Sequence, residues 1–463
     1  MIHDLIHDTI CAVSTPAGTG GLAVIRVSGE NAVSIVKRLW KGADIDTMAS
    51  HTAHLGRITD LNGEVLDEAV LTLFRAPNTF TGEDVVELSC HGSIWIQQQV
   101  MKSLIDAGCR TATGGEFTQR AFANGKLDLS QAEAVADVIA STTKASHRIA
   151  MNQMRGDFSS RLKGLRQQLL NFVSLIELEL DFSEEEVEFA NRQDLQKLAD
   201  DILYEVQKLA QTYSDGNAIK NGLPVAIVGA TNAGKSTLLN ALLHDDRALV
   251  SDIHGTTRDV IEDTITIGGT LFRLIDTAGI RRSSDVIENM GIERSYKKMD
   301  EAQIVLWIID ATCAQSQIEA FLPIINSHCE GKKVVAVFNK IDLEPRFDLD
   351  AQVVKLPLQT SVIGITAKSA ESVARLQQLL VDVAALPQVN DGDVIVTNAR
   401  HYEALTRTAE ALSRVVEGLK TAVSGDFLSI DLRQAMHYLG EITGEITTDD
   451  ILGNIFSKFC IGK

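Results

Sequence analysis

The sequence predicts a multidomain chain that combines an N-terminal α+β part, an α-helical part and a doubly wound α/β part. Its 463 residues correspond to roughly three domains of about 150 residues each. Short strand-like runs separated by glycines occupy the beginning of the chain, and apolar residues at spacings of three and four follow. Strand-like and helical runs then alternate from Leu223 to about Leu386, which is typical of a doubly wound α/β domain.

Composition and charge narrow the class of protein. Apolar residues make up 45% and charged residues 23%, so the chain can build cores and wholesale disorder is excluded. The net charge of −19 argues against a polycation that coats nucleic acid, although a local basic patch remains allowed. The six cysteines form no Cys-x-x-Cys pair, which excludes a zinc scaffold and favours a reducing compartment. Neither a signal peptide nor a membrane helix is expected, so we predict a cytoplasmic protein without membrane contact.

Three runs in the N-terminal part are predicted strands. Leu22–Val27 follows a glycine-rich turn, Ala69–Phe74 precedes a turn at Pro77-Asn78, and Val85–Ser89 is the third run. Together with the residues between them they predict an α+β domain.

The periodicity becomes helical from about Lys126 and stays so to about Leu209. Ser183 and Glu186 have capping-box spacing, and the acidic residues around them suit a helix N-terminus better than a metal cluster. Helical runs resume after Asn390, and we expect them to pack with the earlier helices, with the α/β part inserted between the two. One apolar helix face comprises Leu162, Leu165, Leu169, Phe172, Val173 and Ile176.

A phosphate-binding loop pattern, Gly229–Ser236, joins the buried-strand run Val225–Val228 to a helix over Thr237–Leu243. The glycines let backbone N–H groups surround phosphate oxygens, Lys235 can reach the terminal phosphates, and the Ser236 hydroxyl can ligate Mg²⁺. The order of strand, loop and helix argues against a chance glycine-rich turn. We expect nucleotide contacts from Asn232, Ala233, Gly234, Lys235, Ser236 and Thr237.

A second strand end supplies groups for magnesium and the γ-phosphate. The strand Leu271–Ile275, hairpinned to Thr264–Ile267, ends in an Asp-x-x-Gly motif, whose acidic residue supports the Mg²⁺ shell and whose glycine N–H can meet the γ-phosphate. The motif consists of Asp276, Thr277, Ala278 and Gly279.

The motif that follows a third strand predicts which base the bound nucleotide carries. The strand Val334–Phe338 leads to Asn339, Lys340 and Asp342. A carboxylate only accepts hydrogen bonds, which suits the N1–H and N2–H₂ donors of guanine, whereas adenine would leave a buried Asp342 unpaired. The predicted nucleotide is therefore GTP, and further base contacts are expected from Thr366, Ala367 and Lys368.

The loop between these motifs is a predicted switch. Thr257 is the expected second Mg²⁺ ligand, which would bind when the γ-phosphate is present and release after hydrolysis. Nucleotide contacts are expected along Ser251, Asp252, Ile253, His254, Gly255, Thr256 and Thr257.

The catalytic group is not evident from these motifs. Ile280 stands where many small GTPases have a glutamine that orients water, so this group must come from elsewhere. Glu288 is one candidate, although a solvated loop charge is the commoner explanation for such a residue. Positive charge for the transition state is also missing, which a partner arginine or a bound cation would supply.

Three segments outside the nucleotide motifs have a specific pattern: Gly20–Gly29, Gly115–Phe122 with Asn124–Leu129, and the last five residues, Phe459–Lys463. With these segments and the nucleotide motifs, the whole chain resembles the MnmE (TrmE) family of tRNA uridine-modification GTPases. The departures from its usual pattern are mild, and they are Ser93, Gly114, Ser251 and Thr366.

The resemblance implies four segments: an N-terminal domain over 1–122, a helical domain in two parts over 123–218 and 387–463, and a G domain over 219–386. It also implies a homodimer formed through the N-terminal domain, with a methylene- or formyl-tetrahydrofolate near that interface. The residues that match the folate site are Arg26, Glu87, Lys126 and Lys463, of which the first three would pass as surface charges on composition alone.

The resemblance further implies potassium-dependent pairing of G domains and a catalytic role for Glu288. The implied activity is GTP hydrolysis coupled to modification of C5 of the wobble uridine in tRNA, together with the FAD-containing partner MnmG (GidA), in a hetero-oligomer. Cys460 lies beside the implied folate site and is either a participant in the chemistry or a small buried apolar residue. The implied potassium ligands are Asn232, Ser251, Ile253 and Thr256.

Two alternatives remain open from the sequence. The chain could be a regulatory switch GTPase of ribosome assembly or stress signalling, but such a switch has no use for a folate pocket. A basic helical stretch is as well explained by a solvated face as by a tRNA contact; it contains Arg148, Arg155, Arg161, Lys163 and Arg166.

Overall fold

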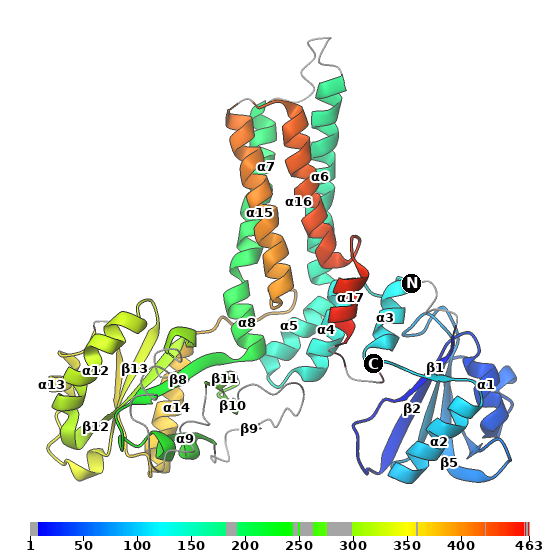
Figure 1. Cartoon of the computed structure of the whole chain (residues 1–463), viewed down its shortest axis with the longest axis horizontal. Helices are drawn as coiled ribbons and strands as arrows, with labels where there is room; N and C mark the ends of the chain where they lie inside the picture. Colours follow the sequence, from blue (N-terminus) through cyan, green and yellow to red (C-terminus); the bar gives the residue numbers. More distant parts are fainter. Residues whose placement is uncertain are drawn as a thin grey trace. The chain divides into compact units, whose positions relative to one another are not determined.

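A computed structural model gives the fold of the chain. It describes residues 8–181, 192–243, 249–250, 263–275, 299–357, 360–421, 423–457, 459 and 462. The chain divides into two compact units, one of residues 1–139, 150–206 and 403–463 and the other of residues 140–149 and 207–402. All four crossings between the units fall inside helices. Figure 1 labels the helices and strands of the chain.

The N-terminal domain is built on a seven-stranded sheet in the order β3-β4-β5-β6-β2-β1-β7. All neighbours pair antiparallel except β1 and β7, which are parallel. The predicted strands are confirmed. The strands are β1 (Ile10–Val13), β2 (Leu22–Ser28), β3 (Trp40–Lys41), β4 (Thr52–Thr59), β5 (Val65–Phe74), β6 (Val85–His91) and β7 (Arg110–Thr111).

Alternating burial gives this sheet two different faces. Ile25, Leu71 and Leu88 point to one face and join a core with helices α1 and α2, whereas Arg26 and Glu87 lie on the other face. This alternation follows from the two-residue period of a strand. The helices of the domain are α1 (Ala32–Leu39), α2 (Ile94–Asp106) and α3 (Glu116–Ala123).

A charge network ties α3 to strand β7 and to the chain before β1. The Glu116 carboxylate accepts hydrogen bonds from Arg110, from Arg120 and from the backbone N–H of Thr113, while Arg120 also binds Asp8 and Glu83. Burial alone would raise the pKa of Glu116, but the hydrogen bonds from Arg110, Thr113 and Arg120 hold this pKa below its usual value. Both Glu116 and Arg120 are almost fully buried, so each charge depends on the other.

The part of the helical domain that the structure describes contains four long helices, α6, α7, α15 and α16. In α6 the predicted apolar face is confirmed, since Leu162, Leu169 and Phe172 are all buried. Helix α16 packs against α6, with an ion pair between Arg433 and Glu177. The C-terminal helices therefore pack with the earlier ones, as predicted. The helices are α4 (Leu129–Ala140), α5 (Lys144–Arg155), α6 (Asp157–Asp181), α7 (Arg192–Gln211), α8 (Tyr213–Asn221), α15 (Ala399–Lys420), α16 (Gly425–Thr443) and α17 (Asp449–Phe456).

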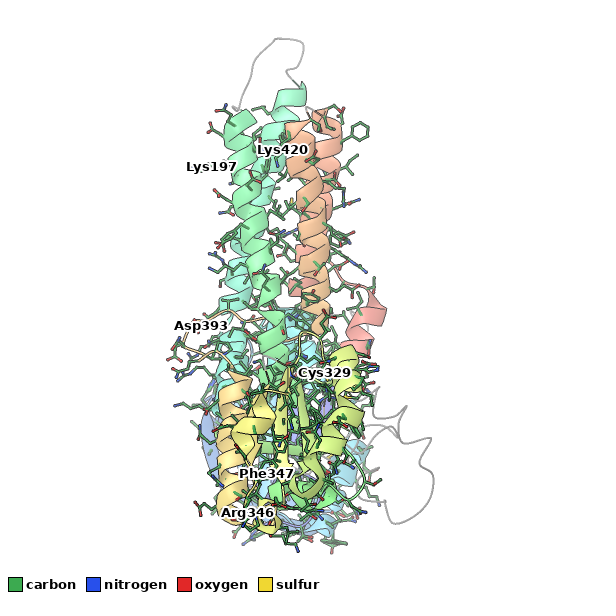
Figure 2. All side chains as sticks on the ribbon, turned by 90° about the vertical axis from the view of Figure 1, so that its left-hand side faces the viewer. Lys197, Cys329, Arg346, Phe347, Asp393 and Lys420 are labelled. Atoms are coloured by element: carbon green, nitrogen blue, oxygen red, sulfur yellow. The ribbon has the colours of Figure 1, made fainter. Side chains whose placement is uncertain are left out.

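Helices α7 and α15 run antiparallel. Lys197, near the beginning of α7, and Lys420, the last residue of α15, lie at the same end of the bundle (Figure 2). At the other end Tyr213 stacks on Tyr402, with ring centroids 4.6 Å apart. The chain that enters the inserted domain is thus held beside the chain that leaves it.

The inserted domain has a second seven-stranded sheet, in the order β14-β13-β12-β8-β11-β10-β9. Strands β14, β13, β12, β8 and β11 are parallel, and β10 and β9 extend the sheet antiparallel. The strands are β8 (Leu223–Gly229), β9 (Leu249–Val250), β10 (Asp263–Ile267), β11 (Thr270–Leu274), β12 (Ile304–Asp310), β13 (Lys333–Asn339) and β14 (Ser361–Gly364).

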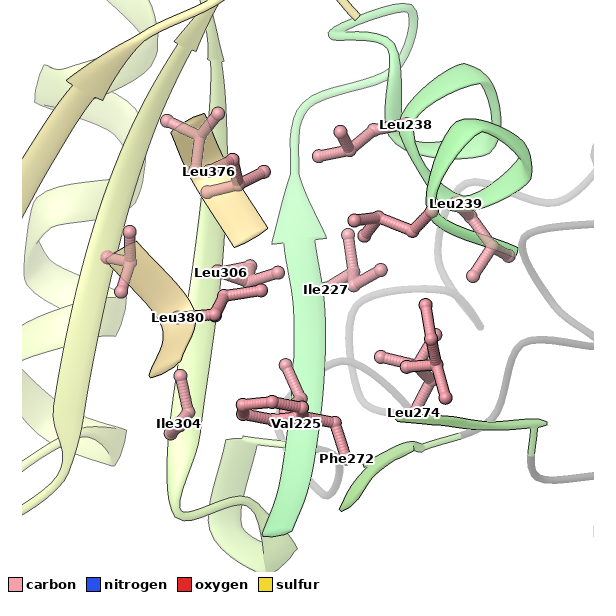
Figure 3. Close-up of a cluster of buried hydrophobic side chains, with 14 of the residues drawn as sticks. Val225, Ile227, Leu238, Leu239, Phe272, Leu274, Ile304, Leu306, Leu376 and Leu380 are labelled. Atoms are coloured by element: carbon pink, nitrogen blue, oxygen red, sulfur yellow. The ribbon is translucent and has the colours of Figure 1, made fainter. Parts of the chain in front are cut away.

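Helices cover both faces of this sheet. On one face Ile227 of β8 packs among Leu238 and Leu239 of α9 and Leu376 of α14 (Figure 3). On the other face Trp307 packs with residues of α12. The central strands β8, β12 and β13 are apolar between their ends because neither face of the sheet meets water. The predicted doubly wound class is confirmed; the helices are α9 (Lys235–Leu243), α12 (Ala314–His328), α13 (Leu349–Val353) and α14 (Ala370–Ala384).

Several expectations are not tested by this fold. The bounds of the four predicted segments stay predictions, and the capping box at Ser183 and Glu186 lies outside the described residues. Among the helices that the structure describes, none is both long and apolar enough to cross a bilayer.

We expect Glu116→Gln to lower the free energy of unfolding of the N-terminal domain by about 3 kcal/mol at neutral pH, because it removes a buried partner of two guanidinium groups. The pKa of Glu116 is lower in the folded chain than in the unfolded chain, so its contribution is complete at neutral pH. It disappears as the pH falls through the lowered folded-state value. Hydrogen exchange of N-terminal-domain peptides in rising urea, at pH 7 and at acid pH, measures this difference.

The matched control is Asp46→Asn, which removes an exposed pair with Lys37 and should change stability little. A gap between wild type and Glu116→Gln that stays the same at acid pH would contradict the assigned role of the carboxylate.

Candidate functional site

The phosphate-binding loop occupies the predicted junction between β8 and α9. The loop requires glycine at Gly229 and Gly234, where φ is 144° and 101° and an added Cβ would collide with Ile308 O and Asn339 Nδ2. Lys235 Nζ donates to the carbonyl oxygens of Gly229 and Ala230 at 2.8 and 2.7 Å. The predicted order of strand, loop and helix is therefore observed, with the lysine lying across the loop.

Asn339 connects this loop to the segment after β14. Its side chain is 2% exposed, and its Nδ2 donates to Ala233 O at 2.9 Å while its Oδ1 accepts from Ala367 N at 3.0 Å. An amide can donate and accept at once, so one side chain holds two backbone segments. The structure thus brings three predicted motifs together at the carboxyl ends of β8, β13 and β14.

Asp342 and Thr366 lie side by side at this edge. Thr366 Oγ1 donates to Asp342 Oδ1 at 3.0 Å, so the hydroxyl fixes one oxygen of the carboxylate. The sequence predicts a buried Asp342, but Asp342 is exposed in the structure. The base itself would therefore have to cover this carboxylate. Lys368 is also exposed.

Lys340 is held by a residue that the sequence analysis did not select. Its Nζ donates to Asp310 Oδ2 at 2.5 Å. Asp310 is the last residue of the buried strand β12, directly opposite Asn339 of β13. An acidic residue at the end of an otherwise apolar strand beside a nucleotide motif is the signal that could have found it.

Magnesium and potassium have only part of their predicted ligands in the described chain. Ser236 lies in the first turn of α9, and Asn232 is exposed in the loop with φ of 63°. No cluster of three or more metal-ligating side chains occurs among the residues placed by the structure. The residues that lie outside the described part are Ser251, Asp252, Ile253, His254, Gly255, Thr256, Thr257, Asp276, Thr277, Ala278, Gly279, Glu288, Cys460 and Lys463.

Arg26 and Glu87 form an ion pair on the N-terminal sheet. They face each other on β2 and β6, and Arg26 donates to Glu87 Oε1 from Nη2 at 2.7 Å and from Nε at 2.9 Å. The guanidinium lies 5.7 Å from the ring centroid of Phe80 and 5.6 Å from that of Phe117. The sequence analysis missed both phenylalanines, because no pattern around them separates them from core residues.

Lys126 lies at the loop that carries Phe80. Its Nζ donates to Pro77 O at 2.9 Å, and a Cβ at Gly82 would lie 3.4 Å from Lys126 Cγ. The loop of residues 77–82 is therefore in contact with both Lys126 and Arg26. Two of the four predicted folate residues, Arg26 and Lys126, thus contact one loop, and Glu87 pairs with Arg26.

The C-terminal tail reaches the same sheet. Gly462 O accepts from Ser14 Oγ at 3.1 Å, and Gly462 has φ of 95° with no room for a Cβ beside Val13 O. Ser14 N in turn donates to Val24 O, two residues before Arg26. Ser14 and Gly462, which are 448 residues apart in the sequence, are therefore neighbours. They meet just after the end of β1, the strand that pairs with the Arg26 strand β2.

Four of the five residues of the basic stretch lie within ion-pair distance of an acidic residue. Arg161 pairs with Glu205, and Arg166 pairs with Glu445. Arg148 contacts Asp391 at 3.3 Å, and Lys163 lies 4.0 Å from Asp128. These four cations thus have acidic partners within the chain, and their side chains are 33–60% exposed.

Comparisons with known proteins cover nearly the whole chain. A profile described as the GTP-binding protein TrmE N-terminus matches residues 9–126, and one described as the MnmE helical domain matches residues 129–460. Proteins named "tRNA modification GTPase MnmE" from Parabacteroides distasonis and Bacteroides thetaiotaomicron are 56% and 55% identical, over 98% and 99% of this chain and 100% of each relative.

A solved structure of the G domain of the T. maritima FeoB iron transporter is 24% identical, covers 35% of this chain and 98% of its own, and has a TM-score of 0.27. A similarity of this size bears on no function. Identity above 50% along the full length of the relatives, together with a described P-loop and guanine-motif edge, shows that the chain belongs to the MnmE (TrmE) family of tRNA modification GTPases.

Proposed function

We propose that this GTP hydrolase is activated by potassium and modifies C5 of the wobble uridine in certain tRNAs. With a flavoprotein partner of the MnmG (GidA) type it would add an aminomethyl or carboxymethylaminomethyl group. The carbon would come from a methylene- or formyl-tetrahydrofolate. The relatives are named for tRNA modification, and the likeness extends over all parts of the chain.

The contact of the C-terminal tail with the N-terminal sheet carries the folate part of this proposal. Gly462 lies at Ser14, and Ser14 directly follows β1, the strand that pairs with β2 and Arg26. Lys463, the next residue in the sequence, and Lys126 would supply cations for an anionic folate tail, and Cys460 would lie near the same site.

The side chains present also fit a pterin ring. Glu87 can accept hydrogen bonds from the amino group of a pterin, and it is about one-quarter exposed. Phe80 presents a partly exposed ring beside Arg26, and aromatic faces stack on flat heterocycles. The bound folate would supply the one-carbon unit. A second copy of the chain, paired through the N-terminal domain, would complete this site.

The nucleotide half of the proposal rests on the edge that Asn339 holds together. Hard oxygen ligands suit magnesium, which Ser236 and Thr257 would hold. Asn232, Ser251, Ile253 and Thr256 would hold potassium, which supplies the positive charge that the chain lacks at the phosphates. Glu288 would orient the attacking water, since Ile280 has no polar group to do so.

Two measurements together test the proposed function. Isothermal titration of the full-length protein with 5-formyl-tetrahydrofolate should show binding, and Arg26→Ala should weaken it. Mass spectrometry of tRNA nucleosides from cells that lack the gene should show loss of C5-aminomethyl wobble uridines and their return on complementation. Intact nucleosides without folate binding would favour a regulatory switch GTPase instead.

Asp342→Asn should weaken GTP binding by at least about 100-fold and improve binding of xanthosine triphosphate, because an amide can donate to the xanthine oxygen. Competition titrations with both nucleotides measure the change. Asp348→Asn is the matched control, since Asp348 is a carboxylate outside the nucleotide motifs that accepts from Ala351 N and caps α13. Unchanged preference for guanine would reject the role of Asp342.

GTP turnover should be faster in potassium than in sodium at equal ionic strength, on the order of 100-fold if the ion replaces a missing cation. Asn232→Gly should remove this difference, because glycine keeps the positive φ of the loop and lacks the side-chain oxygen. Nucleotide affinity measured in both salts separates binding from turnover. Equal rates in the two salts would exclude potassium activation.

A further inference from the structure

Asp310 stands at the edge of the sheet where the guanine motif begins. It ends strand β12 (Ile304–Asp310), and the parallel register places it opposite Asn339 of β13. It belongs to none of the nucleotide motifs of the sequence. Its side chain is only 10% exposed, so its charge needs partners within the protein.

The carboxylate of Asp310 is fixed from two directions. Oδ1 accepts from Thr312 N at 3.0 Å and from Thr312 Oγ1 at 2.7 Å, which caps the turn Ala311–Cys313. The backbone N–H of Asp310 donates to Gln317 Oε1 at 2.9 Å. The second oxygen of the same carboxylate, Oδ2, accepts from Lys340 Nζ at 2.5 Å.

Asp310 is ionised at neutral pH. Burial alone would raise its pKa, but the hydrogen bonds from Lys340 and Thr312 hold the pKa below the usual aspartate value. The contact with Lys340 is therefore between full charges, and such hydrogen bonds are stronger than neutral ones.

Lys340 has a constrained backbone as well. Its φ of 64° is in the left-handed region, where residues other than glycine are uncommon. Leu343 N donates to Lys340 O at 3.0 Å, and the preceding residue is the buried Asn339. Because its backbone and its ammonium are both held, the four-carbon stem of Lys340 runs from the end of β13 to the end of β12, at the carboxyl edge of the sheet. A free lysine stem would instead sample many rotamers.

We propose that Asp310 is a positioning residue for the guanine base. It holds the Lys340 ammonium so that the Lys340 stem covers one face of the base, while Asp342 binds the edge of that base. This inference rests on the proposed nucleotide role of Asn339–Asp342 and adds a residue outside that motif. The competing explanation is that Asp310 only caps the turn at Thr312.

A double-mutant cycle separates these explanations. Asp310→Asn keeps an oxygen for Thr312 and removes the charge, and Lys340→Met removes the ammonium and keeps an apolar stem. We expect each single variant to speed the release of a fluorescent GDP analogue by about 10- to 100-fold. If Asp310 acts through Lys340, the double variant should release the analogue no faster than the worse single variant.

Two further variants test whether loss of the turn cap alone could explain faster GDP release. Asp310→Ser retains a capping hydroxyl for the turn and should release GDP as fast as Asp310→Asn. Thr312→Ala removes a cap contact without touching Lys340, and it should leave GDP release within about twofold of wild type. The same cycle in the Asp342→Asn background, read with xanthosine diphosphate, should give the same fold-changes, because the stem contacts a face that both bases share.

The inference would be overturned, and the nucleotide site left in place, by either of two results. In the first, the fold-changes in GDP release of the two single variants multiply in the double variant. In the second, Asp310→Asn releases GDP at the wild-type rate. Failure of the wild-type protein to bind GDP would overturn the nucleotide site and this inference with it. Circular dichroism melts of each variant verify that the inserted domain remains folded.

Discussion

The hydrogen bonds of one buried amide organise the nucleotide-binding edge of this protein. Asn339 donates to a carbonyl of the phosphate-binding loop, 106 residues away, and accepts from the backbone of Ala367, 28 residues away. Neither a carboxylate nor an alkyl side chain could make both bonds. A side chain at Gly234 would collide with the Asn339 amide. The glycine of the phosphate-binding loop and the asparagine of the guanine motif therefore depend on each other.

The same edge shows how a parallel sheet assembles a site from distant residues. Strands β8, β12, β13 and β14 all end there, and the residue after each buried run is polar or glycine. Asp310 belongs to this set by position, although no sequence motif includes it. Its ion pair with Lys340 joins β12 to the guanine motif in the way that Asn339 joins the phosphate-binding loop.

In the N-terminal domain the candidate site residues Arg26 and Glu87 lie on one face of the sheet rather than at the ends of its strands. The sheet presents both residues on the face opposite the apolar core, and Gly462 is held beside that sheet by its hydrogen bond with Ser14. The network of Glu116, Arg110 and Arg120 fixes α3, whose Phe117 lies against the Arg26 guanidinium. Basic residues of α5 and α6, in contrast, pair mainly with acidic residues of neighbouring segments, which suits a chain with a net charge of −19.

The sequence by itself determined the features that depend on neighbours along the chain. The junction of β8, loop and α9, the apolar face of α6 and the guanine motif all follow from local periodicity, turn residues and side-chain chemistry. Only the tertiary structure decided which distant residues meet: Asp310 with Lys340, Gly462 with Ser14, and Phe80 with Arg26. Strand order and register decide those pairs, and they arise from burial summed over the whole domain rather than from any local pattern.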